Sequence, residues 1–335
     1  MREFGVGFLG IDIGVKEIVR LTRLAEEQNF GTCWLAEDYF YRGAFSLAAT
    51  CAAQTKSIRI GIGVINPYTR HPALTAMEVA GLAEAAGAER VILGLGASVK
   101  SWIEKMNIPY SRPRRSLQEA VEIIRPMLRG EALTYAGQQF QVSGIKFAFS
   151  PVSAAVPIYL GVVGPKNLEL AGEIADGVLL SVMTSPQYVR YALEQIRNGA
   201  RKRGRTMDDF DLQAYLLISI DKDRKRARDA IKPFIGTLIG MAGFFGPDPL
   251  LTSTGLRPEE IKPLTEVALK GGDVSPLVSD WMLDTFTISG TPEECQESLH
   301  RLLEAGLTSP VAFEIPGMNF EEVIRNVRQF LFSAN

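Results

Sequence analysis

The sequence predicts a (β/α)8 barrel on the basis of two features. Short apolar runs alternate with helical patterns almost from end to end, which is typical of βα units and of a parallel sheet. In addition, no Gly-x-Gly-x-x-Gly turn follows the first apolar run, so a dinucleotide-binding sheet is disfavoured. We expect one barrel domain over residues 1–335, with a strand-rich insertion at about 131–156 and a helical one at about 222–285.

The expected strands are apolar runs without polar alternation, because both faces of a parallel sheet are buried. Each run should be followed by a helix, and the clearest one comes after Pro113, where Leu117, Val121, Ile124 and Leu128 share one face. The expected strands cover residues 4–9, 32–36, 58–65, 91–95, 158–163, 178–182, 212–220 and 311–315. Further helices are expected around Ile18, over 45–55, 73–86, 167–174 and 187–202, from Thr291 to about Ala305, and from Phe320.

Two of these helix starts carry capping signals. Thr291 and Glu294 have the spacing of a capping box, with Pro292 at the first helical position. Asn319, followed three residues later by Glu322, is expected to cap the last helix in the same way. Both starts support the boundaries of the closing βα units.

Charge and composition exclude several classes of protein. Thirty-six Lys and Arg residues against 38 Asp and Glu residues give a formal net charge of −2, whereas a nucleic-acid or anionic-membrane binder would show a basic excess. No stretch approaches the roughly 18 apolar residues of a membrane span. The 3 cysteines and 2 histidines suit neither a disulfide framework nor a zinc site, so no metal is expected. We expect a cytoplasmic protein that acts on a small-molecule substrate.

Four of the expected strands end in polar or glycine residues at the same mouth of the barrel. Ligands of parallel barrels bind at this end, because the loops that follow the strands converge there. Gly61 and Gly63 on the third strand either let the backbone approach a ligand or only serve strand packing. The four ends are Glu37-Asp38-Tyr39, Val64-Ile65-Asn66, Gly96-Ala97-Ser98 and Gly161-Val162-Val163-Gly164.

The fourth strand end continues into a helix start that suits an anion. Gly164 and Pro165 begin this helix, and free amide groups at the positive end of a helix dipole favour a phosphate. An ordinary capped helix start is the alternative.

The candidate catalytic residues are Asp38, Glu37 and Tyr39. Adjacent carboxylates on a strand point to opposite faces, and we expect Asp38 to be the one that faces the barrel mouth. There it could act as a general acid or orient a substrate, although strand-end carboxylates often only cap loops. His71, between Arg70 and Pro72, is expected to form loop hydrogen bonds rather than to catalyse.

Several sequence blocks resemble a known family, the coenzyme F420-dependent methylenetetrahydromethanopterin reductases of the bacterial luciferase-like superfamily. The resemblance covers nearly the whole chain and is strongest over residues 30–180. The blocks are Gly63-Val-Ile-Asn-Pro-Tyr-Thr-Arg-His-Pro72, Val91-Ile-Leu-Gly-Leu-Gly96, Pro157-Ile-Tyr-Leu-Gly-x-x-Gly-Pro165 and Ala171-Gly-Glu-Ile-Ala-Asp-Gly177.

The resemblance implies a luciferase-like barrel with insertions that forms homodimers or higher oligomers and binds F420, or alternatively FMN, at the carboxyl ends of its strands. It also implies a non-prolyl cis peptide at Gly63-Val64 behind the cofactor ring, and backbone contacts to phosphate around Val163, Gly164 and Pro165. The cofactor-binding residues expected are Gly63, Val64, Asn66, Gly96, Ala97, Ser98, Gly161, Val163, Gly164 and Pro165.

The chain departs from this family at three positions near the expected substrate. Reductases of this branch tend to carry a glutamate where this chain has Gly7, an Asp-His pair where it has Glu37-Asp38, and an acidic residue where it has Val99. The resemblance implies an F420-dependent oxidoreductase that transfers hydride between the deazaflavin and a small organic or pterin-like substrate. Alternatives are an FMN-dependent luciferase-like monooxygenase or reductase, a cofactor-binding protein without turnover, and, least favoured, a barrel lyase or isomerase without redox chemistry.

Overall fold

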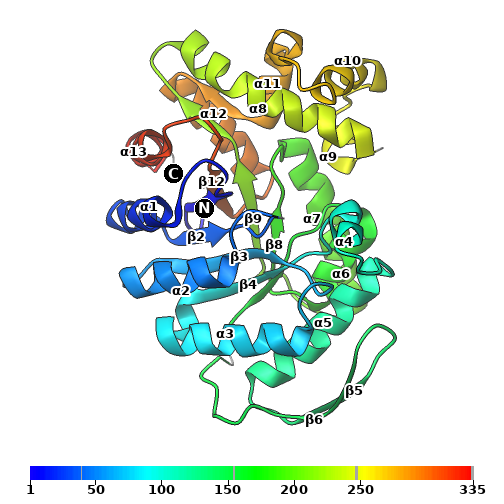
Figure 1. The fold of residues 1–335 in the computed structure, drawn as a ribbon. Helices are drawn as coiled ribbons and strands as arrows, with labels where there is room; N and C mark the ends of the chain where they lie inside the picture. The colour runs from blue at the N-terminus through cyan, green and yellow to red at the C-terminus, as the bar shows by residue number, and fades with distance from the viewer. Residues whose placement is uncertain (39, 154, 246–247, 333–335) are drawn as a thin grey trace.

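The structure is a computed structural model that describes residues 1–38, 40–153, 155–245 and 248–332. Within these residues, eight parallel strands close into a barrel in the order β1-β12-β9-β8-β7-β4-β3-β2, with helices around it (Figure 1). The expected fold class is therefore confirmed. The barrel strands are β1 (Gly5–Phe8), β2 (Thr32–Leu35), β3 (Arg59–Ile65), β4 (Val91–Leu95), β7 (Ile158–Leu160), β8 (Gly177–Leu180), β9 (Asp211–Leu216) and β12 (Ser309–Phe313).

The helices that connect the strands begin and end close to the expected residues. The capping box of Thr291 and Glu294 is present at the start of α12, and the Asn319 side chain accepts a hydrogen bond from the amide of Glu322 at the start of α13. The helices around the barrel are α1 (Val15–Glu27), α2 (Ala44–Gln54), α3 (Pro72–Ala86), α5 (Pro113–Leu128), α6 (Pro165–Ile174), α7 (Pro186–Lys202), α12 (Pro292–Glu304) and α13 (Phe320–Phe330).

Two of the groups of elements outside the barrel lie at opposite ends of Figure 1. The antiparallel hairpin of β5 (Leu133–Ala136) and β6 (Gln141–Ile145) extends at the bottom of Figure 1. The helices α8 (Arg224–Phe245), α9 (Pro249–Thr252), α10 (Pro258–Ala268) and α11 (Asp280–Phe286) gather at the top. No helix among the residues described has both the length and the apolar character needed to cross a membrane.

Some elements differ from the expectation, among them the fifth barrel strand, β7, which ends at Leu160 instead of residue 163. The run 212–220 is not one strand: β9 ends at Leu216, and β10 (Ile218–Ile220) pairs in parallel with β11 (Ile288–Gly290) in a separate two-stranded sheet. The apolar pattern continues across the break because β10 is also buried, so periodicity alone could not locate it. The short helix α4 (Lys100–Lys105), between β4 and α5, was not expected.

Candidate active site

A cavity of about 500 Å³ lies at the carboxyl ends of the barrel strands. Its walls come from the ends of most of the strands and from the start of α6, which places it where the sequence predicts ligand binding. The lining residues are Leu9, Ala36, Asp38, Gly63, Val64, Gly96, Ala97, Ser98, Tyr110, Pro113, Gly161, Val162, Val163, Gly164, Asn167, Leu179, Leu180, Ser181, Val182, Tyr215, Phe234, Leu238 and Phe313.

Most of the expected site residues meet in this cavity. Asn66 and Pro165 lie beside it without lining it, Glu37 points elsewhere, and Tyr39 lies outside the described residues. The expected residues that line the cavity are Asp38, Gly63, Val64, Gly96, Ala97, Ser98, Gly161, Val163 and Gly164.

The peptide bond between Gly63 and Val64 is cis, as the family resemblance implies. The Val64 side chain packs against the ends of two neighbouring strands. A Cβ atom on Gly96 would lie 2.5 Å from Val64 Cγ2, and one on Gly161 would lie 2.6 Å from Val64 Cγ1. Side chains at these two positions would therefore displace Val64, which explains why glycines surround this part of the cavity.

Tyr215 supports the same peptide from inside the barrel. Its hydroxyl donates a hydrogen bond to the carbonyl oxygen of Gly63 at 3.1 Å, and its ring packs on Phe313 with centroids 4.3 Å apart. Burial, and to a smaller extent the nearby charge of Asp38, raise the pKa of the Tyr215 hydroxyl well above its usual range. Tyr215 is therefore a neutral hydrogen-bond donor at neutral pH.

The structure separates the two adjacent carboxylates. Asp38 lines the cavity, and burial raises the pKa of its carboxyl group. Glu37 instead accepts a hydrogen bond from the amide of Ala44 at the start of α2 (3.0 Å). Its Oε1 atom also forms an ion pair with Arg70 Nη1 at 3.6 Å. These contacts give Glu37 a structural role in holding two loops together, and they leave Asp38 as the carboxylate of the pair that lines the cavity.

The loop after β3 is built by its own polar side chains. Asn66 is buried, and its Oδ1 atom accepts hydrogen bonds from the amides of Tyr68 and Thr69, both at 3.0 Å. Asn66 thus forms the turn next to the cavity rather than a wall of it. His71 Nδ1 accepts a hydrogen bond from the amide of Ala73 at 3.1 Å and caps α3, so the expectation of a loop hydrogen-bonding role for His71 is confirmed.

The start of α6 reaches the cavity through Gly164 and Asn167. Gly164 is the N-cap residue, no side chain caps the helix, and a Cβ atom on Gly164 would find no neighbour within 4 Å. Open space and uncapped amide groups at a helix N-terminus suit a phosphate group. Pro165 occupies the first helical position, so it shapes this start without lining the cavity.

Helix α8 brings part of the second insertion over the mouth of the barrel. Phe234 and Leu238 from this helix line the cavity, and their spacing of four residues places them on one helical face. The helical segment that follows β10 therefore supplies an apolar cover to the site. The sequence left open which inserted segment would do so.

Sequence reasoning missed several residues at the site. Tyr215 and Phe313 were assigned to buried strands, and nothing local indicates that they reach the cavity.

Glu314, just after β12, is buried and accepts hydrogen bonds from the amides of Leu9 (3.0 Å) and Gly10 (2.8 Å). An acidic residue inside an apolar run was a signal of such a role. Burial outweighs these bonds and raises the pKa of Glu314.

A closed parallel barrel with a cavity at the carboxyl ends of its strands defines the protein as a ligand-binding (β/α)8 barrel. The model of the luciferase-like monooxygenase family matches residues 6–309. The chain is 37% identical to the 5,10-methylenetetrahydromethanopterin reductase of Methanolobus tindarius over 325 residues, covering 96% of this chain and 97% of the relative. It is also 37% identical to that of Archaeoglobus fulgidus over 316 residues, covering 92% of each.

Among solved structures, the coenzyme F420-dependent tetrahydromethanopterin reductase from Methanopyrus kandleri superposes with a TM-score of 0.89 at 30% identity, covering 98% of both chains. The chain belongs to the luciferase-like monooxygenase family. Within that family it is similar to methylenetetrahydromethanopterin reductases, which confirms the resemblance seen in the sequence.

Proposed function

We propose that this protein is an oxidoreductase that binds coenzyme F420 and transfers a hydride between the deazaflavin and a small organic or pterin-like substrate. One observation supports this most directly: the cis peptide at Gly63-Val64, the glycine-lined wall and the start of α6 all open into the same cavity. The similarity to methylenetetrahydromethanopterin reductases over more than nine-tenths of the chain supports the same cofactor.

The residues of the cavity fit such a cofactor. Gly96 and Gly161 leave room for the Val64 side chain at the cavity wall, where it can support one face of a flat ring. After Gly164, Pro165 has no amide hydrogen, and the amides of Asn167 and Leu168 donate to the carbonyl oxygen of Gly164. The amide of Lys166, at the positive end of the helix dipole, can therefore receive a phosphate of the cofactor tail. When bound, the deazaflavin supplies the hydride chemistry, and the protein supplies orientation and exclusion of water.

Asp38 is the residue we assign to proton transfer. Among the described residues that line the cavity it is the one carboxylic acid, and its raised pKa keeps a larger fraction protonated than for an exposed aspartate. A protonated carboxyl in the cavity can donate a proton to the substrate or orient it by a hydrogen bond. Glu37 and Tyr39 stay alternative candidates from the sequence, although the contacts of Glu37 favour a structural role.

The lining also supports a choice of substrate class. Among the described residues that line the cavity, none is Lys, Arg or His, so a phosphorylated substrate would have no cationic side chain to pair with there. Tyr215, Phe313 and Phe234 instead offer aromatic surface. Aromatic walls with one carboxyl group suit a flat heterocycle such as a reduced pterin.

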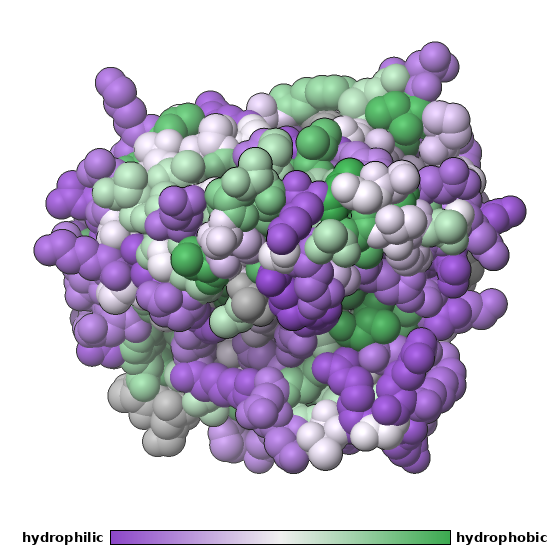
Figure 2. Space-filling view, turned by 90° about the horizontal axis from the view of Figure 1, so that it is seen from below, coloured by the Kyte–Doolittle hydropathy of each residue, from purple (hydrophilic) through white to green (hydrophobic). Residues whose placement is uncertain are grey.

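We also propose that the chain works as a single barrel domain and forms a homodimer through α2 and α3. Leu74 and Met77 on α3 are 51% and 47% exposed, and a hollow of about 310 Å³ between the two helices is lined by Phe45, Ala49 and Met77 among others. A two-fold dimer pairs one patch with itself, so an apolar helical face can meet its own copy. Figure 2 shows hydrophobic patches among hydrophilic side chains on the lower face of the molecule.

A cytoplasmic location is part of the proposal. The cysteines Cys33, Cys51 and Cys295 are all free and buried, as a reducing compartment permits.

A titration of the purified protein with F420 and with FMN, followed by fluorescence quenching, tests the proposed function. We expect tight binding of F420 and weak or no binding of FMN, followed by reduction of methylenetetrahydromethanopterin when reduced F420 is supplied. Preference for FMN would move the protein to the flavin-dependent monooxygenases, and F420 binding without any turnover would indicate a cofactor-binding protein. Binding of neither would contradict the proposal.

A further inference from the structure

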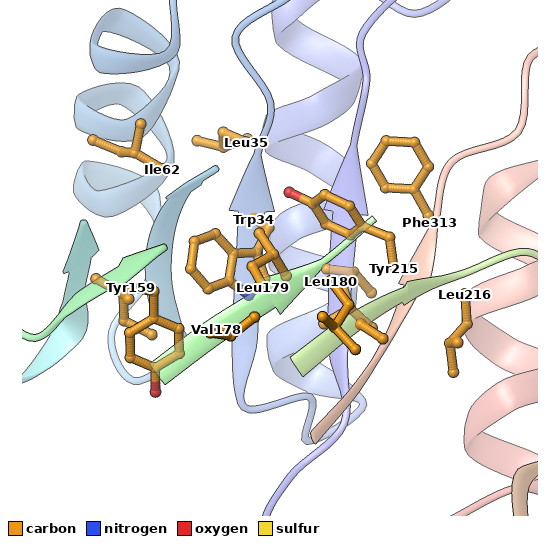
Figure 3. Packing of buried hydrophobic residues seen from close by; sticks show 14 of the residues in the cluster. Trp34, Leu35, Ile62, Tyr159, Val178, Leu179, Leu180, Tyr215, Leu216 and Phe313 are labelled. Atoms are coloured by element: carbon orange, nitrogen blue, oxygen red, sulfur yellow. The ribbon is translucent and has the colours of Figure 1, made fainter. Parts of the chain in front are cut away.

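Trp34 lies in the barrel interior directly below the cavity and does not line it. It belongs to β2, is fully buried, and its register partner on β3 is Gly61, two residues before Gly63. Figure 3 shows Trp34 among the interior side chains Tyr159, Leu179 and Tyr215. The indole therefore occupies the layer beneath the cis peptide.

Three glycines make room for this indole. A Cβ atom on Gly61 would lie 2.5 Å from Trp34 Cδ2, one on Gly63 would lie 2.6 Å from Cε3, and one on Gly94 would lie 3.3 Å from Cζ3. On the side of β3 and β4, the ring thus packs against bare backbone. Any movement of the indole acts on the Gly63-Val64 peptide without an intervening flexible group.

A polar chain fixes the orientation of the indole. Trp34 Nε1 donates a hydrogen bond to Gln213 Oε1 at 2.7 Å, and Gln213 Nε2 donates one to Asp211 Oδ2 at 2.7 Å. Because an indole N–H only donates and a carboxylate only accepts, the amide of Gln213 can face only one way. Asp211 is anchored in turn by hydroxyl groups of Tyr159 and Ser309, both at 2.8 Å.

We propose that Trp34 is a positioning residue for hydride transfer. Its fixed indole ring supports the Gly63-Val64 peptide from below and sets the position of this peptide, and thereby the plane of the bound deazaflavin ring. The inference rests on the proposed function. Trp34 packs against Gly63 and does not line the cavity, so its loss should alter ring geometry more than cofactor affinity. Hydride transfer depends steeply on that geometry.

The test uses Trp34→Phe, which keeps an aromatic ring but removes the N–H group and reduces the size of the side chain beneath the peptide. Two quantities are measured on the F420 complex: the circular dichroism induced in the visible band of the cofactor, and the single-turnover rate of hydride transfer. We expect a changed dichroism band and a rate lowered by about ten- to a hundredfold, with the F420 dissociation constant within about threefold of wild type.

Two further variants separate positioning from stability. Phe30→Leu removes a buried ring from the Phe4–Phe30–Phe332 cluster and should lower the Tm while leaving both readouts at wild-type values. Trp34→Phe combined with Gln213→Leu removes the unpaired amide and should recover part of the Tm without restoring the dichroism. Should Trp34→Phe not fold, Gln213→Leu alone frees the indole and should change the dichroism.

Wild-type dichroism and rate in the folded Trp34→Phe or, in its place, the folded Gln213→Leu would overturn the inference. So would recovery of both readouts together with the Tm in the double variant. Failure of the wild-type protein to bind F420 would instead contradict the proposed function, so the two failures are distinguishable.

Discussion

The hydroxyl group of Tyr215 on β9 donates a hydrogen bond to the carbonyl oxygen of Gly63 on β3, 3.1 Å away across the barrel interior. β9 and β3 are not neighbours in the barrel, so this bond spans the interior rather than following a sheet ladder. It connects the Gly63-Val64 peptide at the candidate site to the opposite side of the barrel. It also identifies a residue of the site that no local sequence pattern indicates.

Tyr215→Phe should lower the free energy of unfolding by about 1–3 kcal/mol, because the buried carbonyl of Gly63 loses its donor. Denaturant unfolding measures this loss. Tyr68→Phe is the matched control, since the Tyr68 hydroxyl donates to Ser111 O (2.7 Å) in an exposed setting, and we expect its effect to stay within about 0.5 kcal/mol. Equal effects of the two substitutions would show that the hydrogen bond across the barrel contributes no more to the free energy of unfolding than an exposed hydrogen bond does.

Asp38→Asn should slow hydride transfer by about 10²–10⁴-fold if Asp38 donates the proton. Glu37→Gln is the control, because the amide oxygen can still accept from Ala44, and we expect it to retain most of the activity. Steady-state rates with reduced F420 compare the two variants. A larger loss in Glu37→Gln than in Asp38→Asn would reverse the assignment of the carboxylates.

The pH dependence of Asp38 follows from the direction of its pKa shift. Burial raises the folded-state pKa above the unfolded value, so the contribution of Asp38 to stability is full below the unfolded pKa and is lost as pH rises through the folded pKa. Asp38→Asn should thus gain stability relative to wild type as pH rises over that window. The proton-donating form is lost over the same window, so the wild-type rate should fall there.

Gly164→Asp should weaken F420 binding by about tenfold or more, because it places a carboxylate where the phosphate is expected. The fold should tolerate the change, since the site of the new Cβ atom is open and aspartate is a favourable N-cap residue. Gly164→Ser adds a neutral cap at the same position and should bind more tightly than Gly164→Asp. Fluorescence titration with F420 measures both, and unchanged affinity in Gly164→Asp would reject the phosphate site.

Gly7→Ala should lower the free energy of unfolding by about 1–3 kcal/mol through overpacking. A Cβ atom at Gly7 would lie 2.8 Å from Tyr215 Cε1 and 2.9 Å from Phe313 Cδ2, so two buried rings fill the space beside Gly7. Gly14→Ser, at the open N-cap of α1, is the control and should not destabilise. Thermal and denaturant unfolding measure the stability of both variants. An unchanged free energy of unfolding in Gly7→Ala would contradict this packing.

Met77→Glu should convert the proposed homodimer into a monomer, because it places a charge at the centre of the α2–α3 face. Leu269→Glu, at a similarly exposed leucine (51%) after α10, should leave the oligomeric state unchanged. Light scattering after size-exclusion chromatography measures the mass of each. A monomeric wild-type protein would contradict the proposed dimer, and a dimer in Met77→Glu would place the interface elsewhere.

Much of the fold could be predicted from local pattern. The strand at Val91–Leu95, the helix after Pro113 and the caps at Thr291 and Asn319 follow from periodicity and backbone hydrogen bonding within a few residues. The break at Leu217 could not be predicted, because both segments around it are buried and apolar.

The sequence by itself determined that the chain alternates strands and helices, and therefore that its strand ends, with Asp38, Gly96 and Gly164, gather at one mouth. Only the tertiary structure decided which side chains fill that mouth. Tyr215, Phe313 and Phe234 reach the cavity, and Glu37 does not, because barrel closure and the path of α8 join residues far apart in the chain. Such contacts depend on the register and tilt of whole strands, and no short stretch of sequence contains that information.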